Sequence, residues 1–114
     1  MRRQVYQLCL ALAVIPLPAG AKAWIVLGAG PNSCGQWTQD KAANSNLRDL
    51  DVQWLLGFVS AYNFYESAKG DETNGPDNQG LISWVDNYCA QHPLEQISTA
   101  AIELVTELTN RNKP

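Results

Sequence analysis

Apolar residues recur at three- and four-residue steps along much of the chain, a spacing that predicts amphipathic helices. The strongest pattern covers residues 46–68. Its stripe consists of Leu47, Leu50, Trp54, Phe58, Ala61 and Tyr65, widened by Leu55, Val59 and Tyr62. This pattern predicts a helix of about six turns that is buried on more than one side. Because a glycine weakens a helix interior, we expect Gly57 to permit the close approach of a neighbouring helix.

Cap signals place a short helix before this long one. Ser33 followed by Gln36 fits a capping box, in which the Ser33 hydroxyl accepts from a backbone amide and the Gln36 side chain reaches back. We expect the short helix over residues 34–43, with Trp37 facing inward. The polar residues 44–46 then favour a break, because their side chains compete with the helix for backbone hydrogen bonds.

Two further helices follow a polar loop at residues 69–80. The third helix is expected over residues 81–91. Pro93 predicts a break at His92 and fits the first position of a last helix, with His92 as its N-cap. The stripe of this last helix consists of Ile97, Ala101, Leu104 and Leu108, with Ala100 and Val105 beside them.

The predicted architecture is therefore an all-α bundle of one short and three longer helices. It covers residues 33–110, and a polar tail follows at residues 111–114.

The first 23 residues predict a secretory signal peptide. Arg2 and Arg3 form a basic start, residues 5–17 are mostly apolar, and Ala21-Lys22-Ala23 is a small-x-small cleavage site. We expect cleavage after Ala23, with Ala21 as the second choice. The apolar run is too short to cross about 30 Å of hydrocarbon as a helix. The pattern therefore favours export over a membrane anchor, with the bacterial periplasm as the destination.

Residues 24–32 predict an apolar arm ahead of the first helix. Trp24 to Leu27 runs into Gly28-Ala29-Gly30, which is how a strand enters a dinucleotide-binding turn. Such a turn needs a helix that opens at the glycines and a second strand about 20 residues later. Here the helix starts after Ser33 and the next acidic residues fall on a helix, so we expect the glycines to turn the arm onto the bundle. The sequence leaves open whether the arm packs on its own chain or on a partner.

Signal cleavage changes the charge and the cysteine count. It removes three of the 8 basic residues and none of the 11 acidic ones, leaving a formal net charge of −6. Such an acidic chain argues against nucleic acid binding, which depends on basic side chains. It also lacks the basic amphipathic face of a membrane-surface helix. Cys34 and Cys89 are the two cysteines left, and in a small exported chain they predict one disulfide.

No residue pattern predicts catalysis or metal binding. With both cysteines in a disulfide and His92 as the one histidine, neither a nucleophile–base pair nor a zinc ligand set is indicated. An EF-hand loop starting at Asp71 would need a glutamate at its twelfth position, which is Ile82. We expect a solvated loop there, and a non-enzyme without metal or cofactor.

The aromatic residues predict a protein-binding surface. Most of the aromatic residues stand at helical spacing and are expected in the core. Four tryptophans, with the tyrosines and phenylalanines beside them, are nevertheless a large aromatic surface for so small a domain, and a patch left outside would contact protein clients, one protein partner, or a second copy in a homodimer. The candidate residues for this surface are Trp24, Trp54, Phe58, Phe64 and Trp84. We expect Trp24 and Phe64 to point outward most.

The order of these features resembles the HdeA/HdeB family. Cys34 at a first helix, WLLGFVSAYN on a long helix, WVDNYCAQHPL and a terminal amphipathic helix carry the resemblance, which spans about residues 33–109. The most telling positions are Cys34, Gly57, Cys89 and Pro93. The resemblance implies a small periplasmic helical protein with one disulfide that acts as an acid-stress chaperone and exposes apolar helix faces to clients at low pH. The YCAQHP stretch is also similar to Tai-type periplasmic immunity proteins, which block secreted cell-wall hydrolases.

Overall fold

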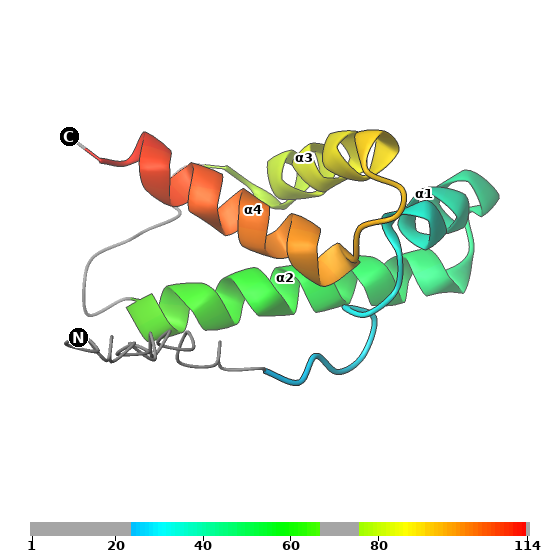
Figure 1. Ribbon diagram of the computed structural model, residues 1–114, viewed down its shortest axis with the longest axis horizontal. Helices are drawn as coiled ribbons and strands as arrows, with labels where there is room; N and C mark the ends of the chain where they lie inside the picture. The colour runs from blue at the N-terminus through cyan, green and yellow to red at the C-terminus, as the bar shows by residue number, and fades with distance from the viewer. Residues whose placement is uncertain (1–23, 67–75, 114) are drawn as a thin grey trace, which may run out of the picture.

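The computed structural model describes residues 24–66 and 76–113, and these residues form four helices. In chain order they are α1 (Cys34–Ala43), α2 (Asn46–Glu66), α3 (Asn78–Gln91) and α4 (Ile97–Arg111). The helix α4 lies between α2 and α3, and α1 closes one end of the bundle (Figure 1). The all-α architecture of one short and three longer helices is confirmed. The predicted signal peptide and most of the predicted polar loop, with Asp71, lie outside the described residues.

The N-terminal caps of α1 and α3 follow from polar side chains. Ser33 Oγ accepts a hydrogen bond from the Gln36 amide at 3.1 Å, which confirms the predicted cap. The Gln36 side chain donates instead to Asp40 Oδ1 at 2.9 Å, so the second half of the predicted capping box is wrong. Asp77 Oδ1 accepts from the Gly80 amide at 2.9 Å, and α3 therefore begins three residues earlier than expected.

The predicted start of α4 is wrong. His92 is the C-cap of α3, with its amide bonded to the Tyr88 carbonyl at 3.0 Å, and α4 begins only at Ile97. The physical reason lies in the segment between them. The Pro93 and Glu95 carbonyls accept hydrogen bonds from the first amides of α1, which holds this segment in a turn instead of a helix.

The lead-in segment caps α4 with its own backbone. The amides of Ile97 and Ser98 donate to the carbonyls of Asn32 and Gly30, each at 2.9 Å. These are amides that the first turn of a helix leaves without an internal partner. The arm is thus tied to the bundle immediately before α1 begins.

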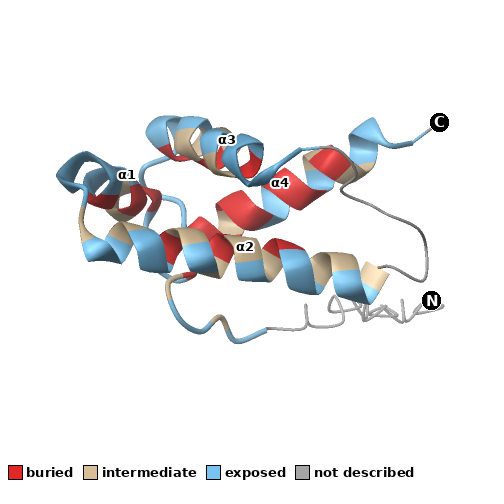
Figure 2. Cartoon of the chain, turned by 180° about the vertical axis from the view of Figure 1, so that it is seen from behind, coloured by how far each residue is buried: buried red, intermediate tan, exposed pale blue. Residues whose placement is uncertain are grey.

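A disulfide and a small apolar core hold the helices together. Cys34 on α1 and Cys89 on α3 form the predicted disulfide, and both residues are fully buried. The predicted stripe of α4 is confirmed, because Ile97, Ala100, Ala101, Leu104, Val105 and Leu108 are all buried (Figure 2). Trp37 also faces inward as expected, with no exposed surface.

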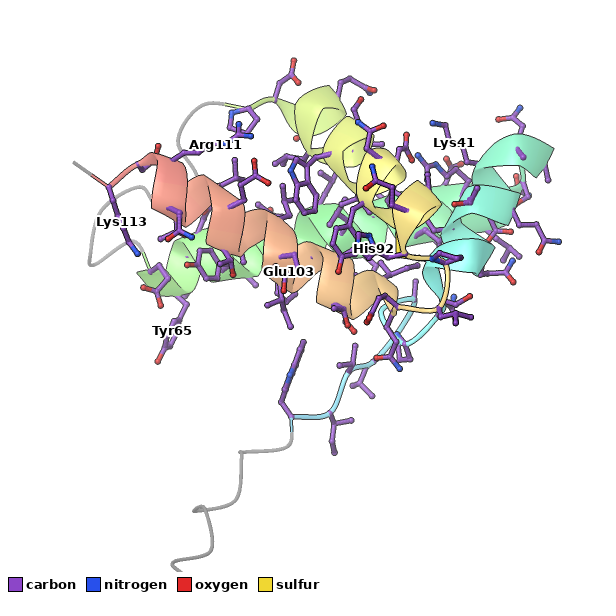
Figure 3. All side chains as sticks on the ribbon, turned by 45° about the horizontal axis from the view of Figure 1, so that its top comes forward. Lys41, Tyr65, His92, Glu103, Arg111 and Lys113 are labelled. Atoms are coloured by element: carbon purple, nitrogen blue, oxygen red, sulfur yellow. A yellow bond between two sulfur atoms is a disulfide. The ribbon has the colours of Figure 1, made fainter. Side chains whose placement is uncertain are left out.

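The predicted buried face of α2 is confirmed only in part. Leu55 and Val59, the residues expected to widen the stripe, are buried together with Asp51, whereas Leu50 is 61% exposed and Tyr65 is 79% exposed and projects away from the bundle (Figure 3). Two apolar stripes run side by side on α2, about 100° apart. The stripe with Leu55 and Val59 is buried and faces α4, and the stripe with Trp54 and Phe58 is only partly buried. Gly57 is exposed with open space around its Cα, so the close helix approach expected there does not occur.

None of the helices in the described part of the chain is long and apolar enough to span a membrane.

Candidate functional site

The apolar arm packs on its own chain, against the outward stripe of α2. Trp54 Nε1 donates a hydrogen bond to the Leu27 carbonyl at 2.7 Å. The Trp54 and Phe58 rings stack with centroids 5.6 Å apart, and the Trp24 ring lies 6.3 Å from that of Phe58. Three of the five predicted surface aromatics therefore form one cluster on one side of α2.

The glycines of the lead-in turn make room for the Trp54 indole. A Cβ atom added to Gly30 would lie 2.3 Å from Cζ2 of Trp54, closer than any real contact. Gly28 has φ +74°, a conformation that favours glycine, and its Cβ would lie 2.9 Å from Trp54 Cδ1. The Gly28-Ala29-Gly30 sequence thus serves an aromatic contact.

Exposed apolar side chains surround this cluster. Ile25 is 84% exposed and Leu27 is 74% exposed on the arm, and Leu47 and Leu50 continue the surface along α2. We call this the arm–α2 surface, which consists of Trp24, Ile25, Leu27, Leu47, Leu50, Trp54 and Phe58. Contiguous apolar surface of this kind is typical of protein-binding sites.

The other two predicted surface aromatics lie elsewhere. Phe64 is 84% exposed near the end of α2. Trp84 lies on α3, where its ring stacks on Tyr88 with centroids 5.4 Å apart, and Tyr88 stacks on His92 at 4.2 Å. Trp84 Nε1 also donates to Glu107 Oε2 on α4 at 2.8 Å. The structure therefore does not bring all five residues into one surface.

A carboxylate on α3 connects three helices. Asp86 accepts hydrogen bonds from Trp37 Nε1 and Lys41 Nζ on α1, each at 2.7 Å, and from Arg48 Nη2 on α2 at 2.8 Å. The Arg48 guanidinium also lies over the Trp37 ring, 4.2 Å from its centroid. We call these four side chains the Asp86 clamp.

The clamp changes the acidity of its carboxyl group. Burial by itself would raise the pKa of Asp86, but the hydrogen bonds from Lys41, Trp37 and Arg48 outweigh burial and lower the pKa below its usual 3.8. The clamp could not be predicted from the sequence, because Asp86 is separated from its three donors by 38 to 49 residues along the chain. The only local signal is that Asp86 directly follows the buried Val85.

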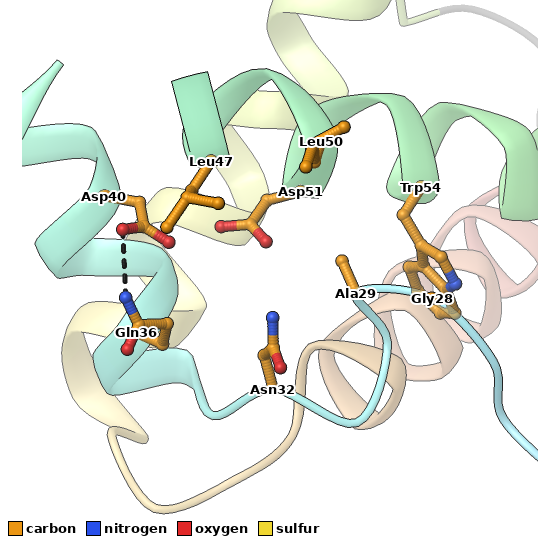
Figure 4. Close-up of a pocket in the computed structure, with 9 residues that line it drawn as sticks. All are labelled: Gly28, Ala29, Asn32, Gln36, Asp40, Leu47, Leu50, Asp51 and Trp54. Atoms are coloured by element: carbon orange, nitrogen blue, oxygen red, sulfur yellow. Dashed lines mark hydrogen bonds between the residues drawn. The ribbon is translucent and has the colours of Figure 1, made fainter. Parts of the chain in front are cut away.

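A second carboxyl site lies between α1, α2 and the lead-in turn. Asp40 is 4% exposed and Asp51 is 1% exposed, and together they border a cavity of about 550 Å³. Figure 4 shows their carboxyl groups pointing toward one another, with Gln36 and Asn32 beside them. We call Asp40 and Asp51 the carboxyl pair.

The pair shifts the acidity of Asp51 in the opposite direction to that of Asp86. Burial, followed by the neighbouring carboxyl group of Asp40, raises the pKa of Asp51 from 3.8 to about 6, although Arg48 and Asn32 oppose the change. Asp51 follows Asp49 near the start of α2, where acidic residues are common because they interact favourably with the helix dipole. The signal that could reveal it is its place four residues before Leu55 and eight before Val59, on the buried stripe.

Compared with protein-family models, curated proteins and solved structures, the chain matches none of them. The resemblance to the HdeA/HdeB family stays a prediction from the sequence.

Proposed function

We propose that this chain is an exported, periplasmic acid-stress chaperone. The observation that supports the proposal best is that two links hold the helices together, one that depends on pH and one that does not. The Asp86 clamp connects α3 to α1 and α2 through a carboxylate, whereas the Cys34–Cys89 disulfide connects α1 to α3 covalently. Strong acid would weaken the first link and leave the second intact.

Protonation is expected to release the clamp. Because the pKa of folded Asp86 lies below its usual value, the clamp contributes stability above about pH 4, and this stability is lost as the pH falls further. Lys41 and Arg48 are then left without their common counter-charge. Over the same range the mature chain changes from a net charge of −6 to about +5 as its 11 acids become neutral and its 5 Lys and Arg side chains stay charged. Like charges then repel one another and favour an expanded molecule.

The part that would open is α2. Its buried stripe, with Leu55 and Val59, packs toward α4, and its charged link to α3 passes through Arg48. When α2 separates, this stripe joins the arm–α2 surface, and both become available to unfolding clients. The disulfide keeps α1 on α3, so that the open molecule refolds quickly when the pH returns to neutral.

A second candidate function is inhibition of one exported hydrolase, as in immunity proteins. The observation that favours it is that the arm–α2 surface is already exposed in the folded protein, with Ile25 at 84% and Leu27 at 74%. A binding surface that needs no opening would work at neutral pH.

The two functions can be separated with the mature chain, residues 24–114. A chaperone should suppress the aggregation of an acid-unfolded client at about pH 2 and do little at about pH 7; an absence of suppression at both would refute it. An inhibitor should instead retain one hydrolase in a pull-down from periplasm at neutral pH.

The clamp itself is tested by Asp86→Asn, which removes the titrating charge. We expect this variant to begin suppressing aggregation at a higher pH than the native chain. Asp49→Asn, on an exposed position of α2, is the matched control and should leave the onset unchanged. If suppression began at the same pH in all three proteins, the clamp would not control the chaperone activity.

A further inference from the structure

The cavity beside the carboxyl pair is lined by both polar and apolar side chains. Asp51 projects from α2 together with Leu47, Leu50 and Trp54, and Gln36 and Asn32 lie across from them (Figure 4). Its volume of about 550 Å³ is within the range of small-molecule sites. The cavity therefore suits a ligand that has one polar end and one apolar body.

The carboxyl pair lacks sufficient partners of its own. Asp40 Oδ2 and Asp51 Oδ2 are buried, and neither accepts a hydrogen bond from the residues described. Gln36 Nε2 and Ser45 Oγ donate to the other oxygen of Asp40, at 2.9 and 3.4 Å. The Asn32 amide near Asp51 acts to lower the pKa of that carboxyl group. Since both amides act on the pair as neutral partners, they do not compensate its charge.

The nearby cations do not balance the acids. Lys41 Nζ on α1 and Arg48 Nη2 on α2 donate to Asp86 on α3, and Arg48 Nη1 is buried without a hydrogen-bond partner among the described residues. Together with the carboxyl pair, these five ionised side chains carry a net charge of −1, and the lead-in turn adds only neutral Asn32 here. One further positive charge would neutralise the cluster. Because an uncompensated buried charge is destabilising, such a charge would stabilise the carboxyl pair.

We propose that this cavity binds a primary ammonium group on a short apolar body, the ammonium lying beside the carboxyl pair and the apolar part against Leu47, Leu50 and the Trp54 ring. An alkylammonium matches both kinds of lining residue, because it brings one charge with several donors on an apolar stem. This inference is independent of the proposed chaperone function.

A metal ion fits the cavity less well. Gln36 already donates to Asp40, and Leu47, Leu50 and the Trp54 ring offer no oxygen ligand. Ca²⁺ prefers six to eight oxygen ligands and Mg²⁺ about six. Calcium is therefore the competing probe in the test.

The experiment is a titration of the mature chain with n-hexylamine, followed by the NMR signal of the Trp54 indole N–H. We expect saturable shifts at about pH 7.5 that hexan-1-ol, the neutral analogue, does not produce. At pH 5 the affinity should fall about 10-fold, because only about a tenth of Asp51 stays ionised one pH unit below its pKa of about 6. Binding of hexan-1-ol as tight as that of hexylamine, or an affinity independent of pH, would overturn the proposal.

Two variants locate the charge that matters. Asp51→Asn should weaken hexylamine binding by about 10-fold or more, whereas Asp49→Asn, which removes the same charge from an exposed position on the same helix, should not. The pH arm supports or refutes the proposal without any substitution, should Asp51→Asn alter the fold. Saturable shifts with CaCl₂ that exclude hexylamine would overturn the proposal in favour of a metal site.

A third arm distinguishes the source of the ammonium. N-acetyl-lysine methylamide presents the same group as a lysine side chain of a polypeptide. If it binds as hexylamine does, the cavity accepts a lysine from a protein; if only the free amine binds, the ligand is a small molecule.

Discussion

Asp86 and Asp51 both lie beside Arg48, yet their surroundings shift their acidities in opposite directions. Asp86 receives hydrogen bonds from three donors, two of them cationic. Asp51 faces a second carboxyl group, and its oxygen Oδ2 is buried without a partner. Asp51 is fully buried and Asp86 is partly buried, with 15% of its side chain exposed. In both cases burial acts to raise the pKa, so the opposite signs of the two shifts come from the groups around each carboxyl.

The two sites should therefore change the stability of the fold over different pH ranges. The pKa of folded Asp51 is raised to about 6, so its burial destabilises the protein at neutral pH and this penalty disappears as the pH falls toward 4. The pKa of folded Asp86 is lowered, so its contribution is lost only below about pH 4. The bundle should tighten in mild acid and open in strong acid, which would confine chaperone activity to strong acid.

The largest expected effect comes from removing the Cys34–Cys89 disulfide, a link that protonation changes in neither pH range. The disulfide closes a long loop, with 55 residues of separation, and its removal should lower the free energy of unfolding by about 4 kcal/mol. Urea unfolding of the mature chain with and without reductant would measure this. At about pH 2 the oxidised chain should keep much of its helical circular dichroism and the reduced chain should lose it. Equal signals would mean that the disulfide does not maintain the opened state.

Asp86→Asn should produce the next largest effect. It leaves the mostly buried Arg48 charge, 14% exposed, without its carboxylate partner, and we expect a loss of about 2–3 kcal/mol at neutral pH. The loss should vanish at about pH 2, where the native carboxyl is itself neutral. Denaturant unfolding at both pH values checks this, with Asp49→Asn as the control. A loss of equal size at both pH values would show that the substitution acts through packing instead of charge.

Much of the fold could be predicted from sequence where the determinants are local. The bounds of α1 follow from Ser33 and the polar break after Ala43, and the core of α4 follows from one uninterrupted apolar stripe. The disulfide needs only the count of cysteines left after signal cleavage. In these cases no distant residue competes with the local pattern.

The failures have a common physical cause, which is a partner far away in the chain. Trp54 and Phe58 form the more aromatic stripe of α2, and the arm covers this stripe in part. The other stripe packs against α4, although Asp51 interrupts its apolar pattern. The Pro93 segment fits a helix start, yet its carbonyls are used by α1. Neither the Asp86 clamp nor the carboxyl pair has a spacing that a single sequence reveals.

Asp51→Asn should change stability in the direction opposite to Asp86→Asn. Removing a buried charge that faces Asp40 should raise the free energy of unfolding by about 1–2 kcal/mol near pH 7.5. The gain should fall to zero by about pH 4, since Asp51 is then protonated in the native chain. Thermal unfolding over this pH range would measure both. A variant less stable than the native chain at every pH would show that Asp51 is stabilised by contacts other than its charge.

Lys41→Gln should have the smallest effect, although Lys41 and Arg48 bind the same carboxylate. The Lys41 side chain is 54% exposed whereas that of Arg48 is 14% exposed, so water already screens the lysine and its loss should cost less than about 1 kcal/mol. Arg48→Gln is the matched comparison and should cost more, because it removes the buried cation that lies beside both Asp86 and Asp51. Unfolding of both variants at neutral pH would rank the two donors. If the lysine variant were the less stable, the clamp would depend on its exposed contact with α1, and acid would first separate α1 from α3 at Asp86 instead of releasing α2.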